Sequence, residues 1–232
     1  MTTGHYCISR LKRVILKLQN SWWTKELIIE ILGEDNPGTL DIQYTIVTVL
    51  LDQSTPQMIS EALPKVEDIY RKRVAIFGPH HPDSLETRSI LASLLHRLGR
   101  IKESFDIFQE VLPRQQEALV EGHEQLMLTK SNAGVVLLTL KKYEEALRLF
   151  TEVYKIRKTT FGSHHSSTVF EQYNIAAALW GQQKYQEAFA LFQTVYKYQK
   201  KFLGQNHAKS LLTKCQLAVE LEEYCLFIID IN

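Results

Sequence analysis

Apolar residues recur at helical spacing in two alternating stripes. The first stripe has a small or apolar residue followed three positions later by leucine, as in Gly134–Leu137 and Ala176–Leu179. The second runs small, then aromatic four positions later, as in Ala146–Phe150 and Ala188–Phe192. Spacing of three and four residues places each set on one helix face. The pattern predicts antiparallel helix pairs, for example helices over 167–181 and 185–202.

The stripes belong to a sequence repeat of 42 residues. Its clearest mark is a histidine column, followed four residues later by an apolar column. The histidines are His81, His123, His165 and His207, and Asn36 takes the same place one repeat earlier, with about three residues inserted near 52–55. Because one helix pair cannot bury two apolar faces, successive pairs must stack.

The repeat also predicts where helices begin and end. A glycine lies three residues before the column in most repeats, where a left-handed residue would close the second helix of a pair. These are Gly33, Gly78, Gly162 and Gly204, whereas the repeat near 120 has valine. Hydroxyl side chains are expected to cap the first helices. They are Thr39, Ser84, Thr168 and Ser210, and Glu171 lies at capping-box spacing from Thr168.

We therefore expect an all-α fold, a right-handed α-α superhelix (solenoid) of antiparallel helix pairs in a single array over residues 1–232. Its expected parts are a partial unit at 5–35, units at about 36–80, 81–122, 123–164 and 165–206, and a partial unit with an irregular tail at 207–232. Trp22–Trp23 and the apolar run at 226–229 would leave uncapped ends exposed. They indicate either makeshift caps or a piece of a longer array, and we favour the longer array.

Composition narrows the classes of function. Hydrophobic residues make up 45% and charged residues 23%, as in folded proteins. The 27 Lys and Arg balance 26 Asp and Glu, which gives no drive toward nucleic acid or a membrane surface. Local basic clusters such as 71–73 are expected to be solvated helix faces. Three cysteines without a CxxC pair, and no apparent secretory signal, favour a cytoplasmic location.

The histidines are the main candidates for chemistry. Paired histidines at 80–81 and 164–165 suggest a metal, but equivalent positions in stacked repeats lie about 10 Å apart, too far for a shared ion. A role in bracing the turn or capping a helix is the better interpretation. Catalytic and phosphate-binding motifs are not found. We expect no enzyme activity, cofactor or metal.

Several repeats resemble the tetratricopeptide family. Its pattern of small, small and aromatic residues is met by Gly134, Ala146 and Phe150, and again by Ala176, Ala188 and Phe192. The 42-residue period and the linkers at 33–37 and 78–82 resemble the kinesin light chain-like subtype. HEAT and armadillo repeats have similar periods, but they do not require the small and aromatic columns.

The resemblance implies a peptide-binding groove lined by the first helix of each pair, here called helix A. Its expected residues are the positions of helix A that do not enter the core. In three successive repeats they are Glu86, Ser89, Ser93, His96 and Arg97; Leu128, Ser131, Asn132, Val135 and Leu138; and Phe170, Tyr173, Asn174, Ala177 and Trp180. Asn132 and Asn174 would bind peptide main chain, and Tyr173 and Trp180 would anchor apolar side chains.

Two functions follow as expectations. The first is a protein interaction scaffold that binds a partner peptide in this groove. The second is a structural or sensor segment of a longer repeat protein, without a groove ligand of its own. Trp180 also fits a purely structural role over the turn between the helices of its pair. Self-association through the uncapped ends is a further expectation.

Overall fold

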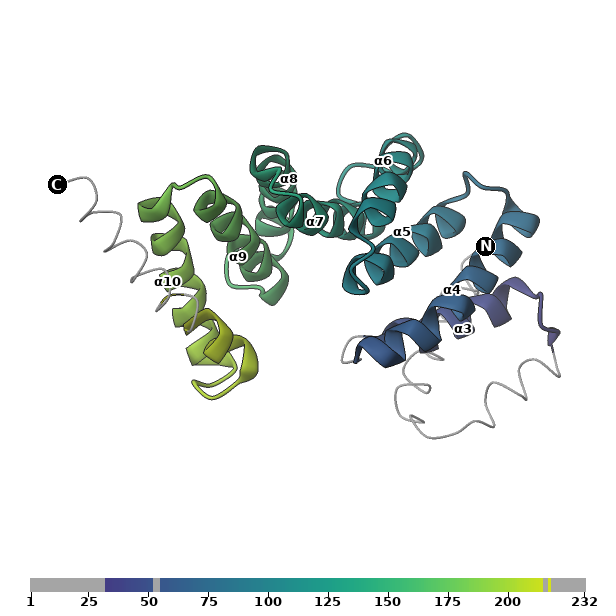
Figure 1. The fold of residues 1–232 in the computed structure, drawn as a ribbon, viewed down its shortest axis with the longest axis horizontal. Coiled ribbons are helices and arrows are strands. Elements are labelled where there is room, and N and C mark those ends of the chain that lie inside the picture. Colours follow the sequence, from purple (N-terminus) through teal and green to yellow (C-terminus); the bar gives the residue numbers. More distant parts are fainter. Residues whose placement is uncertain (1–31, 52–54, 215–216, 218–232) are drawn as a thin grey trace. The chain divides into compact units, whose positions relative to one another are not determined.

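The computed structural model describes residues 32–51, 55–214 and 217, and the regular elements in these residues are all α-helices (Figure 1). They are α3 (Pro37–Leu51), α4 (Pro56–Phe77), α5 (Pro82–Arg97), α6 (Ile101–Ala118), α7 (Glu124–Thr139), α8 (Tyr143–Phe161), α9 (Ser166–Gly181) and α10 (Tyr185–Phe202). The expected all-α repeat fold is confirmed, and the helices expected at 167–181 and 185–202 match α9 and α10.

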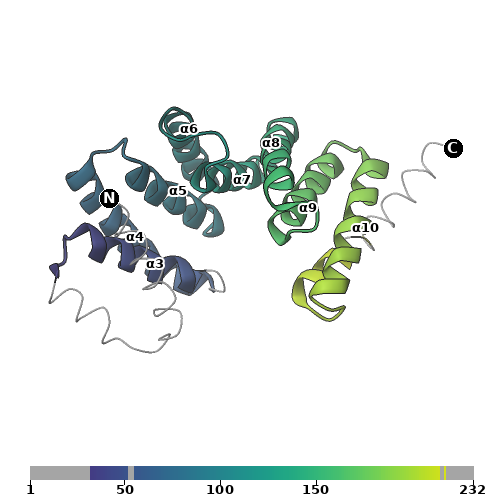
Figure 2. The same cartoon turned by 180° about the vertical axis from the view of Figure 1, so that it is seen from behind.

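The chain divides into two compact units, residues 1–118 and 119–232. In the first unit, α3 packs on α4, α4 on α5, and α5 on α6. In the second, α7 packs on α8, α8 on α9, and α9 on α10 (Figure 2). Helices α3, α5, α7 and α9 are the helices A, and α4, α6, α8 and α10 are their partners, the helices B. The boundaries of the single array expected over 1–232 stay a prediction.

The small and aromatic columns form the core within each unit. Phe150 and Phe192 are 0% and 1% exposed, and Ala146 and Ala188 are both fully buried. A Cβ atom added to Gly134 would lie only 2.5 Å from Cε1 of Phe150. Gly134 is therefore required because the aromatic ring of helix B lies directly on the backbone of helix A.

Two sets of left-handed residues shape the connections. The glycines at 33, 78, 162 and 204 all have φ of 86–89°, as expected, and the repeat near 120 uses Gly122 at 88°. A second set, which the sequence pattern did not reveal, lies in the turn from helix A to helix B. It contains Gly99, Lys141 and Gln183, with φ of 79°, 59° and 64°. Two of these three turns therefore hold a left-handed residue that has a Cβ atom.

The histidine column caps the helices A. The Nδ1 atoms of His81, His123 and His165 accept hydrogen bonds from the backbone N–H groups two residues later, at 3.2–3.3 Å. His207 does the same with Lys209, and Asn36 uses its side-chain oxygen. The interpretation of these histidines as helix caps is confirmed.

The expected hydroxyl caps are wrong. Thr39, Ser84, Thr168 and Ser210 are buried three residues beyond the cap position. Thr39 donates to the carbonyl of Gly33 at 2.8 Å instead of capping a helix. Glu171, expected to complete a capping box, is fully buried and binds other partners, because helix B of the preceding pair covers this part of α9.

The features expected at the two chain ends lie outside the described residues. This holds for Trp22–Trp23, for the apolar run at 226–229, and for Cys7, Cys215 and Cys225.

Candidate functional site

A column of buried polar residues crosses the helices B. It recurs every 42 residues and contains Arg73, Gln115, Arg157 and Gln199, which are 0–9% exposed. The expectation that the basic cluster at 71–73 is a solvated face is wrong for Arg73, which is 2% exposed. Arg73 points into the packing of α4 on its neighbours, whereas the Arg71 side chain is 74% exposed. The 42-residue spacing of these four polar residues is visible in the sequence and could have revealed the column.

In the first unit, Arg73 links two helices A. Its Nη2 atom lies 2.6 Å from Oδ1 of Asp41 on α3. Its Nη1 atom donates to the hydroxyl of Thr87 and the carbonyl of Asp83 on α5, at 2.8 and 3.0 Å. The guanidinium also lies 4.6 Å from the ring centre of Tyr44. Burial, and the nearby carboxylate of Glu86, raise the pKa of Tyr44 well above its usual range, so it stays neutral.

In the second unit, Arg157 makes the equivalent link between α7 and α9. It contacts Glu124 at 3.3 Å and Glu171 at 3.1 Å. Glu171 also accepts from the Ser131 hydroxyl at 2.7 Å and from the Asn174 amide at 3.4 Å. Burial raises the pKa of Glu171, and these donors partly oppose the shift. The cluster joins side chains from three helices into one hydrogen-bonded network.

The residues expected to line a groove in the first unit differ in exposure. Ser89 is only 4% exposed, so it enters the core, contrary to expectation. Ser93 is half-buried and donates to the Ser89 carbonyl at 3.1 Å. Glu86 and His96 are half-buried, burial lowers the pKa of His96, and Arg97 is exposed.

In the second unit the expected groove residues fall into three groups. Ser131 and Asn174 are 3% and 4% exposed and belong to the network around Glu171, so the expectation that they stay out of the core is wrong. Leu128 and Phe170 are 46% and 48% exposed. The half-buried group is Asn132, Val135, Leu138, Tyr173, Ala177 and Trp180.

Two of the aromatic members also pack within the fold. Tyr173 meets Phe192 edge-on, with ring centres 5.3 Å apart. Trp180 meets Tyr185 at 4.4 Å, across the turn from α9 to α10. Trp180 therefore covers this turn, and any ligand would meet a ring that is already held in place.

Leu128 and Phe170 occupy one column of the repeat. Its next member, Leu212, is 59% exposed, and the equivalent residues of the first unit are Asp41 and Glu86. The first unit thus has carboxylates beside Arg73 where the second has exposed apolar side chains. An apolar column open to solvent is a feature of surfaces that bind other molecules.

Among the described residues, no group of three or more His, Cys, Asp or Glu side chains could hold a metal ion. In that same part of the chain, no helix is long and apolar enough to cross a membrane.

Known proteins resemble this chain in sequence and in fold. Models of the tetratricopeptide repeat match residues 83–159 and 172–209. A crystal structure of a putative kinesin light chain from Podosopora anserina, with nearly identical repeats, has 20% identity and a TM-score of 0.59, and covers 87% of this chain and 98% of that one. BtubC (BKLC) from P. vanneervenii has 18% identity and a TM-score of 0.67, over 91% of this chain and 83% of that one. No curated protein sequence matches.

Proposed function

Because the chain is a tetratricopeptide repeat protein with repeats of the kinesin light chain-like kind, we propose that it is a non-catalytic scaffold that binds a partner peptide in a groove lined by its helices A. Repeats of this family generally mediate protein–protein interactions. The observation that carries the proposal is the exposed apolar pair Leu128 and Phe170, one repeat apart on α7 and α9.

The spacing of this pair suggests what a ligand looks like. Neighbouring packed helices lie about 8–10 Å apart, and an extended peptide rises about 3.3 Å per residue. A peptide crossing α7 and α9 would therefore present apolar side chains about three residues apart. Asn132 follows Leu128 by one helical turn on α7 and is half-buried. Its side-chain amide can form hydrogen bonds with the main chain of such a peptide.

The buried members of the expected groove have a different role in this proposal. Asn174 and Ser131 donate to Glu171, so they brace α7 and α9 from within. They position the exposed residues and do not touch the ligand. Tyr173 and Trp180 present the exposed parts of rings that are fixed by Phe192 and Tyr185. A pre-fixed ring loses little conformational freedom when a ligand binds.

A selection from a random peptide library on the immobilised protein tests the proposal. We expect enrichment of peptides with apolar residues about three positions apart. The double variant Leu128→Ser with Phe170→Ser should weaken the selected peptides about tenfold or more, since hot-spot contacts are worth about 2 kcal/mol or more each. Isothermal calorimetry measures the change.

Ile76→Ser is the matched control, because Ile76 is 42% exposed on α4 and lies outside the groove. It should leave peptide affinity unchanged. If no peptide is enriched, or the double variant binds as the parent does, the groove proposal fails. The chain would then be a structural or sensor segment without a groove ligand.

The proposal includes the partner class and the location. The balanced charge supports a protein partner over nucleic acid or a membrane surface. The small, odd number of cysteines, three in all, supports the cytoplasm.

A further inference from the structure

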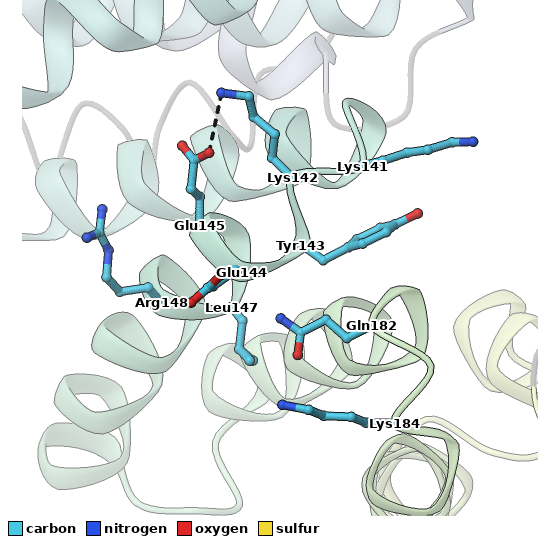
Figure 3. A pocket seen from close by; sticks show the side chains of 9 residues that line it. All are labelled: Lys141, Lys142, Tyr143, Glu144, Glu145, Leu147, Arg148, Gln182 and Lys184. Carbon is cyan, nitrogen blue, oxygen red and sulfur yellow. Dashed lines mark ion pairs between the residues drawn. The ribbon is translucent and has the colours of Figure 1, made fainter.

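A hollow of about 970 Å³ lies in the second unit, between two successive turns from helix A to helix B (Figure 3). One wall is the α7–α8 turn with the first turns of α8, and the other is the α9–α10 turn. Gln182 extends from the α9–α10 turn toward Leu147 of α8, and Lys184 runs beside it. None of the lining residues belongs to the proposed groove.

Cations dominate the rim of this hollow. Four basic side chains and two carboxylates line it, and one pair, Lys142 and Glu145, is joined at 3.3 Å. The side chains of Lys141, Arg148 and Lys184 take part in none of the ion pairs or hydrogen bonds found among the described residues. Unpaired cations along the edge of one hollow attract anionic groups.

Lys184 differs from the equivalent residues of other repeats. Arg100 and Lys142 occupy the same position, and each pairs with the glutamate three residues later, Glu103 at 2.6 Å and Glu145 at 3.3 Å. Glu187 lies at the same spacing from Lys184, but no ion pair joins them in this part of the structure. Lys184 lines the hollow instead. Its charge is therefore available to a ligand.

The two helix ends at this edge add positive potential. Helices α8 and α10 begin beside Lys142 and Lys184, and neither residue makes a side-chain cap. The first N–H groups of a helix carry a partial positive charge, and a side-chain acceptor commonly satisfies one of them. The hollow thus combines unpaired ammonium and guanidinium groups with two helix starts that have no side-chain cap.

A further polar atom distinguishes between kinds of anion. The Oε1 atom of Gln182 is buried in the wall and has no hydrogen-bond partner. A buried acceptor requires an N–H or O–H donor, which a fully ionised inorganic anion does not supply. The main chain of a peptide does. Half-buried Tyr143 and Leu147 add apolar surface for a side chain of such a peptide.

We propose that this hollow is a second binding site, which takes a short acidic segment of a partner protein. Carboxylates of the segment pair with Lys141, Arg148 and Lys184, one of its main-chain N–H groups donates to Gln182, and an apolar side chain packs on Tyr143 and Leu147. The site goes beyond the proposed groove and uses none of its residues.

Fluorescence anisotropy with a labelled peptide of alternating glutamate and leucine tests this site. The triple variant Lys141→Glu, Arg148→Glu, Lys184→Glu should weaken binding about tenfold or more, because each exposed ion pair contributes about twofold to fivefold and reversal adds repulsion. Replacing glutamate by glutamine in the peptide should have a similar effect. Binding should also weaken as salt concentration rises.

The matched control reverses three other exposed lysines of the same unit, Lys155→Glu, Lys197→Glu and Lys200→Glu. It has the same net charge as the triple variant and should change affinity less than twofold. Equal losses in both variants would show unspecific attraction to a basic protein and overturn the proposal, as would unchanged binding by the triple variant. Thermal unfolding confirms that each variant is folded.

Two single variants keep the test decisive if the triple variant does not fold. Lys141→Gly removes a cation at a position whose backbone favours glycine, so it should fold and bind about twofold to fivefold more weakly. Gln182→Leu removes the buried acceptor and should weaken the peptide, but not inorganic phosphate. If phosphate displaces the labelled peptide as well as the unlabelled peptide does, the hollow is a simple anion site and the peptide assignment fails.

Discussion

The two compact units place an arginine at the same position but balance its charge differently. In the first unit, Arg73 pairs with Asp41, which is 38% exposed, and its α5 partners are a hydroxyl, a carbonyl and, at 3.9 Å, the carboxylate of Glu86, which is 26% exposed. In the second unit, Arg157 pairs with Glu171, which is 0% exposed, while its other carboxylate partner, Glu124, is 57% exposed. The same backbone geometry thus accommodates a partly solvated ion pair and a fully buried one.

This difference indicates which carboxylate contributes most to the stability of the fold. A buried ion lacking its partner costs far more than a solvated one, because water cannot replace the lost contact. Of the two carboxylates that pair with Arg157, the buried one, Glu171, therefore contributes more to the stability of the second unit than the exposed Glu124. The first unit distributes the same role over Asp41, Glu86, Thr87 and the ring of Tyr44.

The largest expected effect is that of Glu171→Ala. It should lower the free energy of unfolding of the second unit by about 3–5 kcal/mol, because Arg157 is left buried without this carboxylate. Asp41→Ala in the first unit should cost less, about 1 kcal/mol, since Asp41 is partly solvated and Arg73 keeps the carboxylate of Glu86 at 3.9 Å. Urea unfolding followed by circular dichroism measures both. Similar losses for the two variants would contradict the comparison.

A double variant sharpens the same point. Arg157→Gln with Glu171→Thr copies the residues that the repeat already carries at Gln199 and Thr213. Because the charge and its counter-charge are removed together, the double variant should recover most of the stability lost in Glu171→Ala.

The next effect is steric and concerns the contact between helices A and B. The first unit has Ala92 at the position where the second has Gly134. Gly134→Ala should lower stability by about 1–3 kcal/mol, because its new Cβ atom would overlap Phe150. Adding Phe150→Leu should relieve the overlap. An unchanged melting temperature for Gly134→Ala alone would show that the ring moves aside.

A smaller effect is expected at the caps of the helices A. Asn36 in the first unit and His165 in the second cap with different side chains. His165→Ala should cost about 1 kcal/mol, and His165→Asn should be close to neutral because asparagine is a good cap. Thermal unfolding measures the stability of the two variants. Equal losses of stability would mean that the imidazole ring acts through its stacking on Phe161 and not as a cap.

The smallest effect is a gain in stability at the turns from helix A to helix B. Gly99 fills the left-handed position in the first unit, whereas Lys141 and Gln183 fill it in the second. Lys141→Gly should raise the free energy of unfolding by about 0.5–1 kcal/mol, since glycine adopts this conformation without a steric cost. Gly99→Ala should lower it by a similar amount. Denaturant titrations of both variants provide the check.

The sequence was sufficient for the helices and the apolar core, because both follow from a period that every repeat shares. The residues of the small and aromatic columns pack within their own repeat or on the next one, so the repeated pattern alone predicts their contacts. Caps were harder to predict, since the buried hydroxyls at 84, 168 and 210 fit the usual cap pattern better than the histidines that do the capping.

The site was only partly predictable for a related reason. Arg73 and Arg157 find partners 32 and 14 residues away, so the hydropathy pattern shows only a charge and assigns it to solvent. Likewise, the sequence pattern predicts an exposed groove position for Asn174. In the structure its amide is buried because it donates a hydrogen bond to Glu171. Exposed Leu128 and Phe170 were predicted because no neighbour in the fold alters their exposure.

The carboxylate of Glu171 also identifies which helix belongs beside α8. Hairpins of similar sequence can dock on the wrong neighbour while the chain folds, a typical error of repeat proteins. The positions equivalent to Glu171 hold threonine at 87, 129 and 213, so α9 is the helix A that brings a carboxylate to this place. A misordered stack would leave Arg157 facing a hydroxyl in its place. One unlike residue among near-copies thereby favours the correct order of assembly.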